Sequence, residues 1–162
     1  MMREATDGMD LTDQIKSLFL TTAKDEAYAQ VLQLVLEATG SKYGIFGYLD
    51  EKGNLVVPSM TRDIWDKCQL PEKSVVFPRT MWGDNIWVKA LKQKTTFFSN
   101  EISLRTPKGH IPLTRNVAVP IIHQNEVVGL FQVANRGCNY EDREIKLLEQ
   151  IAAVVAPFIT AR

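Results

Sequence analysis

The sequence of 162 residues lacks several features that would assign it to a class of protein. It has only two cysteines, Cys68 and Cys138, which are far apart and form no CxxC pair. A disulfide framework or a zinc site is therefore not indicated. No run of about twenty apolar residues is present, and residues 1–8 lack the apolar core of a secretion signal. We therefore expect a cytoplasmic protein that does not insert into a membrane.

An excess of charge of one sign is also missing. Nineteen Lys and Arg residues balance nineteen Asp and Glu residues, so the formal net charge at pH 7 is zero. Binding to a phosphate backbone or an anionic membrane surface usually needs a basic patch. The composition thus predicts no nucleic-acid partner. The 45% apolar content fits one compact domain with a sizeable core.

The clearest pattern that is present lies in residues 117–161. Two apolar runs flank the polar residues 123–126, and a short polar connection of this kind predicts a β-hairpin. From Glu141 onward, apolar residues recur at intervals of three or four, which predicts an amphipathic helix. Pro157 removes one backbone hydrogen bond, so the helix should bend near Val154 or end there.

The first half of the chain mixes helical and extended patterns. One helix is predicted to be capped by Asp10 or Thr12, and a second over 25–39 should end at Gly40. The other expected elements are strands over 43–49 and 55–59 around a turn, short extended runs at 74–77 and 95–99, and a helix over 83–93. Together these predict an α+β fold with an antiparallel sheet of five to six strands and helices on both faces.

Three motifs carry a family resemblance: Val117-Ala-Val-Pro-Ile121, Gly129-Leu-Phe-Gln-Val-Ala-Asn135 and Tyr140-Glu-Asp-Arg-Glu144. They resemble the GAF domain, a sensory module of bacterial and archaeal signal-transduction proteins such as sensor histidine kinases and chemotaxis receptors. The resemblance implies a GAF-like sensory domain over residues 25–162, ending in an output helix. Residues 1–24 would then form an N-terminal signalling and dimerisation helix. These motifs mostly build the sheet and the last helix, so they specify fold better than ligand.

The resemblance also implies a ligand pocket in the irregular middle of the chain. GAF-like domains place these segments over the sheet, which would bring together Trp65, Cys68, Trp82, Trp87 and His110. Tryptophan offers a large apolar face and one N–H donor, so three of them around a cavity would suit a flat aromatic ligand. Ordinary core packing is the alternative for each tryptophan.

Two short motifs, Trp65-Asp-Lys-Cys68 and Gly109-His-Ile-Pro112, resemble one GAF branch of sensor kinases. Some members of that branch resemble haem sensors, which implies that Cys68 tethers the macrocycle and that His110 ligates its iron. Arg115 would pair with a carboxylate or propionate of the ligand. The CxxCH signature of c-type attachment is absent. A buried thiol and a histidine hydrogen-bonded to backbone remain the alternatives, and the cofactor is otherwise unknown.

Other chemistries of this family match less well. Members that bind cyclic nucleotides carry Asn-Lys, a phenylalanine and Asp-Glu, whereas this chain has Asn135-Arg136, Tyr140 and Arg143-Glu144. Members that reduce methionine sulfoxide need cooperating cysteines, and Cys138 beside the last helix is poorly placed to serve Cys68. No nucleophile with a base, metal cluster or paired carboxylates is visible. We therefore expect a domain that is not an enzyme.

The resemblance implies a function in signal transduction, for example in a two-component system. The domain would bind a small molecule or sense a redox state, form a homodimer through its terminal helices, and pass the signal to an output domain. The sequence shows no kinase nucleotide-binding motif and no helix-turn-helix, so we expect that output to lie on a missing segment or a separate partner. Two alternatives stay open. The second interpretation is a GAF dimerisation module that binds no ligand, and the third is a thiol-based redox enzyme.

Overall fold

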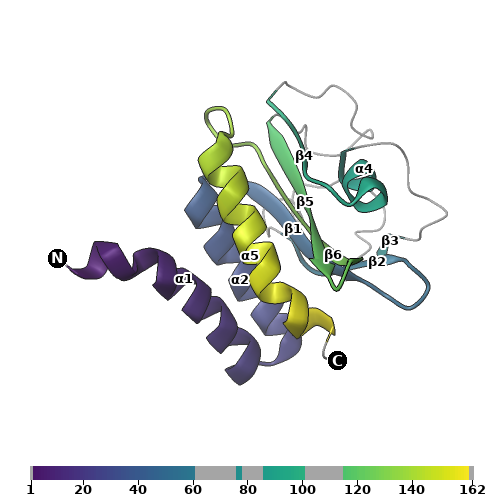
Figure 1. Ribbon diagram of the computed structural model, residues 1–162, viewed down its shortest axis with the longest axis horizontal. Coiled ribbons are helices and arrows are strands. Elements are labelled where there is room, and N and C mark those ends of the chain that lie inside the picture. The colour runs from purple at the N-terminus through teal and green to yellow at the C-terminus, as the bar shows by residue number, and fades with distance from the viewer. Residues whose placement is uncertain (1, 61–75, 78–85, 101–114, 161–162) are drawn as a thin grey trace.

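A computed structural model describes residues 2–60, 76–77, 86–100 and 115–160 (Figure 1). In chain order the elements are α1 (Met2–Thr21), α2 (Lys24–Thr39), β1 (Tyr43–Leu49), β2 (Leu55–Met60), β3 (Val76–Phe77), α4 (Ile86–Gln93), β4 (Phe97–Ser99), β5 (Asn116–His123), β6 (Glu126–Ala134) and α5 (Asp142–Thr160). The predicted elements that fall on described residues are all present.

The six strands form one sheet in the order β3-β2-β1-β6-β5-β4, and every neighbouring pair is antiparallel. The predicted hairpin is β5 and β6, with His123 paired to Glu126. Its turn residues, Gln124 and Asn125, have φ angles of 52° and 71°. Positive φ at both positions is what a two-residue turn needs to follow the twist of the strands. The expected antiparallel α+β fold is therefore confirmed.

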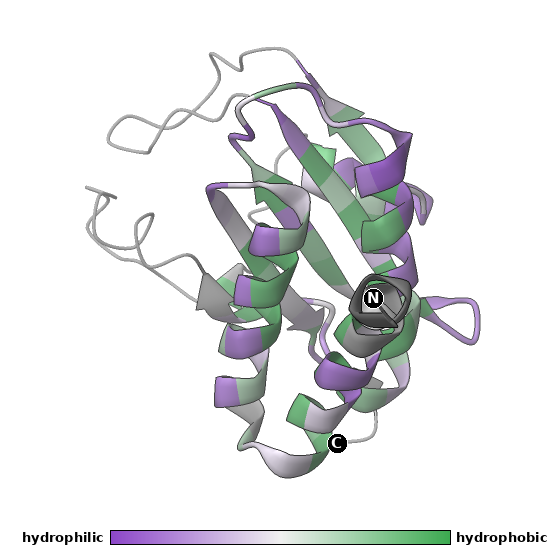
Figure 2. Ribbon diagram, turned by 90° about the vertical axis from the view of Figure 1, so that its left-hand side faces the viewer, coloured by the Kyte–Doolittle hydropathy of each residue, from purple (hydrophilic) through white to green (hydrophobic). Residues whose placement is uncertain are grey.

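Helices cover both faces of the sheet, as predicted. Figure 1 shows α1, α2 and α5 on one side and α4 on the other, and Figure 2 shows hydrophobic residues on the inward sides of the helices. Because successive residues of a strand point to opposite faces, Phe131 of β6 enters the core under α2 and α5. Its neighbour Leu130 enters a separate cluster under α4. The sheet thus divides two apolar layers.

The larger layer contains a chain of aromatic rings. Phe46 of β1 stacks on Phe131 with ring centroids 4.2 Å apart, and it meets Tyr28 of α2 at 4.4 Å. Phe19 of α1 stacks on Phe158 of α5 at 5.3 Å. These contacts join both terminal helices to the sheet, since all five rings lie in one connected group.

The ends of the helices agree only partly with the predictions. Gly40 ends α2 in the left-handed conformation, with φ of 70° and its N–H bonded to Leu36 O. The prediction of a cap at Asp10 or Thr12 is wrong, because α1 already begins at Met2. Adding residues to a helix that is already packed costs much less than starting one, so the helix extends beyond its apolar stripe.

The last helix continues through Pro157 to Thr160, so the predicted alternative that it ends near Val154 is wrong. Pro157 lies on the exposed side of the helix. Beyond it, Phe158 stacks on Phe19 and Ile159 is buried in the core. This packing offsets the single backbone hydrogen bond that proline removes.

Candidate functional site

Four of the six residues predicted to contact a ligand lie outside the described residues. They are Trp65, Cys68, Trp82 and His110. Their roles, including iron ligation by His110, stay predictions. The other two, Trp87 and Arg115, fall on α4 and directly before β5, and the structure gives their surroundings.

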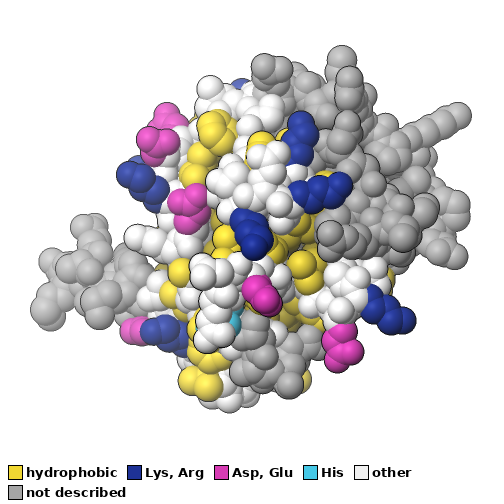
Figure 3. Space-filling model, turned by 45° about the vertical axis from the view of Figure 1, so that its right-hand side comes forward, with side chains coloured by type: hydrophobic (Ala, Val, Ile, Leu, Met, Phe, Trp, Pro, Cys, Tyr) yellow, Lys and Arg dark blue, Asp and Glu magenta, His cyan; other side chains and the backbone are white. Residues whose placement is uncertain are grey.

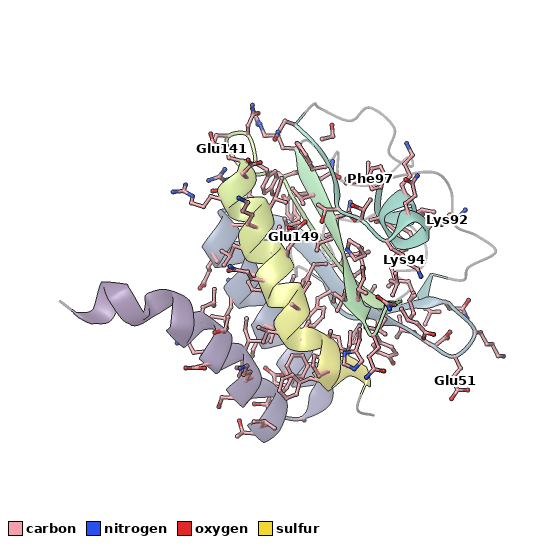
Figure 4. All side chains as sticks on the ribbon, viewed as in Figure 1. Glu51, Lys92, Lys94, Phe97, Glu141 and Glu149 are labelled. Carbon is pink, nitrogen blue, oxygen red and sulfur yellow. The ribbon has the colours of Figure 1, made fainter. Side chains whose placement is uncertain are left out.

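Trp87 lies in the apolar layer under α4. The helix packs on β4, β5 and β6, and its buried residues are Val88, Ala90 and Leu91. Trp87 is half-buried and packs against the cluster that Ala90 and Leu91 form with residues of the sheet. Phe97 of β4 joins the same layer, and Figure 4 shows it between the strand and α4. One of the three tryptophans predicted to line a pocket therefore lies on the α4 face of the sheet, and its contact with a ligand stays a prediction.

Two amide side chains add polarity to this face. Asn116 of β5 is 6% exposed, and its Oδ1 accepts a hydrogen bond of 3.3 Å from Nε2 of Gln132 on β6. By strand alternation they share the face of Ala118 and Leu130, which belong to the cluster under α4. An amide pair offers both donors and acceptors, so it can orient a polar group of a ligand in an apolar layer. The sequence analysis missed both residues, because nothing in the local pattern distinguishes a polar residue that faces a buried layer.

Arg115 is bound to the loop between β6 and α5. Its Nε donates to Asn139 Oδ1 at 2.9 Å, and its Nη1 donates to Arg136 O at 3.4 Å. The carbonyl of Arg115 also accepts the N–H of Asn135 at 2.7 Å. Contact with a ligand carboxylate stays a prediction, and in this structure two N–H groups of the guanidinium hold the loop.

The same loop is fixed by a buried carboxylate. Glu144, whose side chain is 4% exposed, pairs with Arg136 and Arg143 at 3.1 Å each. Its other oxygen accepts the N–H of Glu141 at 2.8 Å, one half of a capping box at the start of α5. Burial by itself would raise the pKa of Glu144, but the Glu141 N–H, the Arg143 hydrogen bond and the Arg136 charge together hold that pKa below its ordinary value.

Tyr140 is the centre of a second set of contacts in this loop. Its N–H donates to Asn100 Oδ1 at 2.7 Å, and its carbonyl accepts from Asn100 Nδ2 at 3.2 Å. Its hydroxyl is 2.6 Å from Ser41 Oγ at the end of α2. Burial raises the pKa of the Tyr140 phenol above its ordinary value, although the Ser41 hydrogen bond and the Arg136 charge oppose that change. The spacing of Glu141 and Glu144 was a signal for the cap, whereas the contact with Asn100 had no local signal.

A hollow of about 260 Å³ lies on the α5 side of the sheet. Its lining residues are Lys94, Thr95, Thr96, Val119, Pro120, Ile122, Glu149, Ala152 and Ala153. Thr96 Oγ1 donates to Glu149 Oε2 at 2.6 Å, and Lys94 Nζ donates to Asn125 O at 3.1 Å. Figure 3 shows apolar side chains on this side of the molecule with charged ones around them, and Figure 4 labels Lys94 and Glu149. The hollow is on the opposite face of the sheet from Trp87.

The part of the chain that the structure describes offers little metal or thiol chemistry. Within those residues, no group of three or more His, Cys, Asp or Glu side chains is placed to hold a metal ion. Cys138 is a free, exposed cysteine in the loop before α5. None of the described helices is both long and apolar enough to cross a membrane.

The fold and these motifs define one class of α+β domain, and comparison with known proteins identifies its family. The family model of the GAF domain matches residues 21–160. The chain therefore belongs to the GAF domain family. The predicted family is confirmed.

One curated relative is named a "Methyl sulfide methyltransferase-associated sensor", from Methanosarcina acetivorans. It is 25% identical over an alignment of 143 positions, which covers 84% of this chain and 14% of the relative. The chain thus spans 14% of the length of this relative.

Several solved structures share the fold. The GAF domain of a phosphoenolpyruvate-protein phosphotransferase from Coxiella burnetii has a TM-score of 0.74 at 14% identity, over 96% of this chain and 94% of that one. The free methionine-R-sulfoxide reductase from Neisseria meningitidis has a TM-score of 0.67 at 16% identity, over 95% and 89%. The same fold therefore occurs in a GAF domain of a phosphotransferase and in a free methionine-R-sulfoxide reductase, and it does not decide what this chain does.

Proposed function

We propose that this GAF domain senses a small molecule or a redox state and passes that state to an output domain through its terminal helices. The observation that carries this proposal is the division of the molecule into two layers by one sheet. Trp87, Asn116 and Gln132 lie on the face under α4, and α1 and α5 pack on the other face. A ligand under α4 would contact the same strands that support the terminal helices.

The size of the response follows from linkage. A ligand shifts the output only by the difference between its affinities for two states of the domain. Coupling free energies of about 1–3 kcal/mol are typical for such sites. A small displacement of β5 and β6 would be passed on to α5, because α5 packs on both strands.

Haem is the first ligand to test. Among the described residues, the cluster under α4 is apolar, and the amides of Asn116 and Gln132 share its face of the sheet. An apolar layer beside Trp87 would suit a flat macrocycle. Cys68 and His110 would supply the thiol tether and the imidazole ligand that the sequence suggests. Haem, when bound, would supply a redox-active iron.

A regulatory role is favoured over a thiol-based redox enzyme. The relative at 25% identity is named a sensor, whereas the reductases share the fold at lower identity. We further propose a cytoplasmic homodimer formed through α1 and α5, which contact each other through Phe19 and Phe158. The N-terminal end of α1 extends beyond the rest of the molecule in Figure 1, where it is available to a second copy.

The deciding experiment is an absorption spectrum of the full chain titrated with haem, both oxidised and reduced. We expect stoichiometric uptake, a Soret band that shifts on reduction, loss of covalent attachment in Cys68→Ala, and an altered band in His110→Ala. Cys138→Ala is the matched control, because its thiol is free and exposed in the loop before α5. That variant should behave as the wild type.

Other results would redirect the proposal. A flat spectrum would eliminate haem and leave other aromatic ligands of the Trp87 layer to be tested by thermal shift. Turnover of free methionine sulfoxide that depends on Cys68 and Cys138 would replace the sensor by an enzyme. A domain that dimerises but is stabilised by no ligand would be a dimerisation module.

A further inference from the structure

The two ends of the connection between β4 and β5 lie side by side. Ser99 of β4 pairs with Asn116 of β5. Asn100 and Arg115, the next residues outward, therefore stand at the base of the connection 101–114. Both side chains reach the same partner, the loop 136–140 that leads into α5.

The contact from Asn100 is a double hydrogen bond to backbone. Its Oδ1 accepts the N–H of Tyr140 at 2.7 Å, and its Nδ2 donates to the carbonyl of the same residue at 3.2 Å. Asn100 thereby holds Tyr140 as a neighbouring β-strand would. This fixes both the position and the orientation of the peptide groups next to the first turn of α5.

The contact from Arg115 holds the other side of the loop. Its guanidinium donates to Asn139 Oδ1 at 2.9 Å and to Arg136 O at 3.4 Å. Arg136 in turn pairs with Glu144 at 3.1 Å, and Glu144 caps the first turn of α5 through Glu141 N–H. An unbroken set of polar contacts therefore runs from the base of the connection to the helix cap.

We propose that Asn100 and Arg115 are positioning residues that couple the base of the 101–114 connection to the first turn of α5. This inference rests on the proposed function in one respect, namely that α5 is an output helix. A change in the spacing of the two side chains would move the loop 136–140, and with it the cap formed by Glu144. Coupling between two sites is reciprocal. A perturbation of the cap should therefore affect the base of the connection as strongly as a perturbation of the base affects the cap.

The test is residue-resolved amide hydrogen exchange on the full chain. In Asn100→Ala, and separately in Arg115→Ala, we expect the amides of Glu141 and Ile145 to exchange about tenfold faster. These amides report the first turn, because they donate to Glu144 and to the carbonyl of Glu141. The amide of Ile151, in the middle of α5, should change less than about threefold.

Two further variants separate coupling from simple destabilisation. Thr96→Val removes a bond of 2.6 Å from the α4–β4 turn to Glu149, so it loosens a contact with the middle of α5 without touching the loop. It should leave the amides of Glu141 and Ile145 within about twofold of wild type. In the reverse direction, Glu144→Gln should speed exchange at the amide of Asn116 by about threefold or more.

Each outcome decides the inference. Faster exchange confined to the first turn, together with the reverse effect of Glu144→Gln, supports it. Unchanged exchange at Glu141 and Ile145, or an equal rise at Ile151, overturns it. The proposed function is tested separately by ligand uptake, so a domain that binds no ligand can still show the coupling, and one that binds haem can lack it.

Discussion

Glu144 is the residue whose loss should reveal most about the start of α5. Replacing it by Gln keeps the shape but removes the charge that Arg136 and Arg143 neutralise at 3.1 Å. Hydrogen bonds to charged partners contribute more than neutral ones, so we expect the free energy of unfolding at pH 7 to fall by about 2 kcal/mol. Urea unfolding measures this change. Glu37→Gln, on an exposed carboxylate of α2, should have almost no effect.

The same carboxylate predicts a dependence on pH. Because the pKa of Glu144 in the folded protein lies below its ordinary value of 4.5, its ionised form stabilises the fold above that pH. This contribution is lost as the pH falls through the folded-state pKa. The difference in unfolding free energy between wild type and Glu144→Gln should therefore be constant from pH 6 to 8 and shrink below 4.5. A difference that grows on acidification would contradict the assignment.

Gly129 tests how closely β1 and β6 approach each other. A Cβ at this position would lie 2.5 Å from the carbonyl oxygen of Gly47 and 2.8 Å from Ile159 Cδ1. The backbone of Gly47 cannot move away from the added methyl group at low energetic cost. Gly129→Ala should therefore lower the free energy of unfolding by about 2 kcal/mol and the Tm by about 6 °C. Gly137→Ala is the matched control, since nothing lies within 4 Å of its added methyl group. Equal melting temperatures for the two variants would rule out the clash.

At the scale of elements, Phe19 is the aromatic side chain that attaches α1 to the core, beside the buried Ile15. Phe19 stacks on Phe158 at 5.3 Å and meets Tyr28 edge-on at 5.8 Å. Phe19→Ala should cost about 2 kcal/mol, because the residue is only half-buried and aromatic pairs add to its burial. Chemical unfolding gives the value, and amide exchange should show α1 opening before the sheet. Gln14→Ala, at an exposed position of the same helix, should leave both unchanged.

The elements were predictable where local periodicity is strong. Alternating residues defined β5 and β6, and the interval of three or four defined α5. The start of α1 was not predictable, because Gly8 and its polar neighbours form helix poorly by themselves. The passage of α5 through Pro157 depends on packing of Phe158, which no window of sequence contains.

The candidate site was predictable only in part, for a related reason. The resemblance placed Trp87 among segments over the sheet, and its contact with a ligand stays a prediction, whereas the amides of Asn116 and Gln132 became visible only once strand pairing was known. The contact of Asn100 with Tyr140 joins positions that are forty residues apart. Long-range polar contacts of this kind follow from topology, which the local pattern does not encode.

For the whole molecule, the sheet and the loop before α5 offer two routes between the faces. Strands β5 and β6 carry Asn116 and Gln132 on one side and support α5 on the other. The loop 136–140 joins the base of the β4–β5 connection to the cap of the same helix. Both routes end on α5, which together with α1 forms the surface that we propose for dimerisation.

That dimer makes a final prediction, which depends on an exposed apolar side chain. Leu20 lies in the last turn of α1 and is 73% exposed, the largest value among the large apolar residues described. A charge placed in an apolar interface should raise the dimer Kd by at least about tenfold, so Leu20→Glu should sediment as a monomer at concentrations where wild type is dimeric. Phe98→Glu is the matched control, because Phe98 is 52% exposed on the edge strand β4, whereas α1 packs on α2 and α5. Loss of dimer in Phe98→Glu alone would move the interface to the sheet edge.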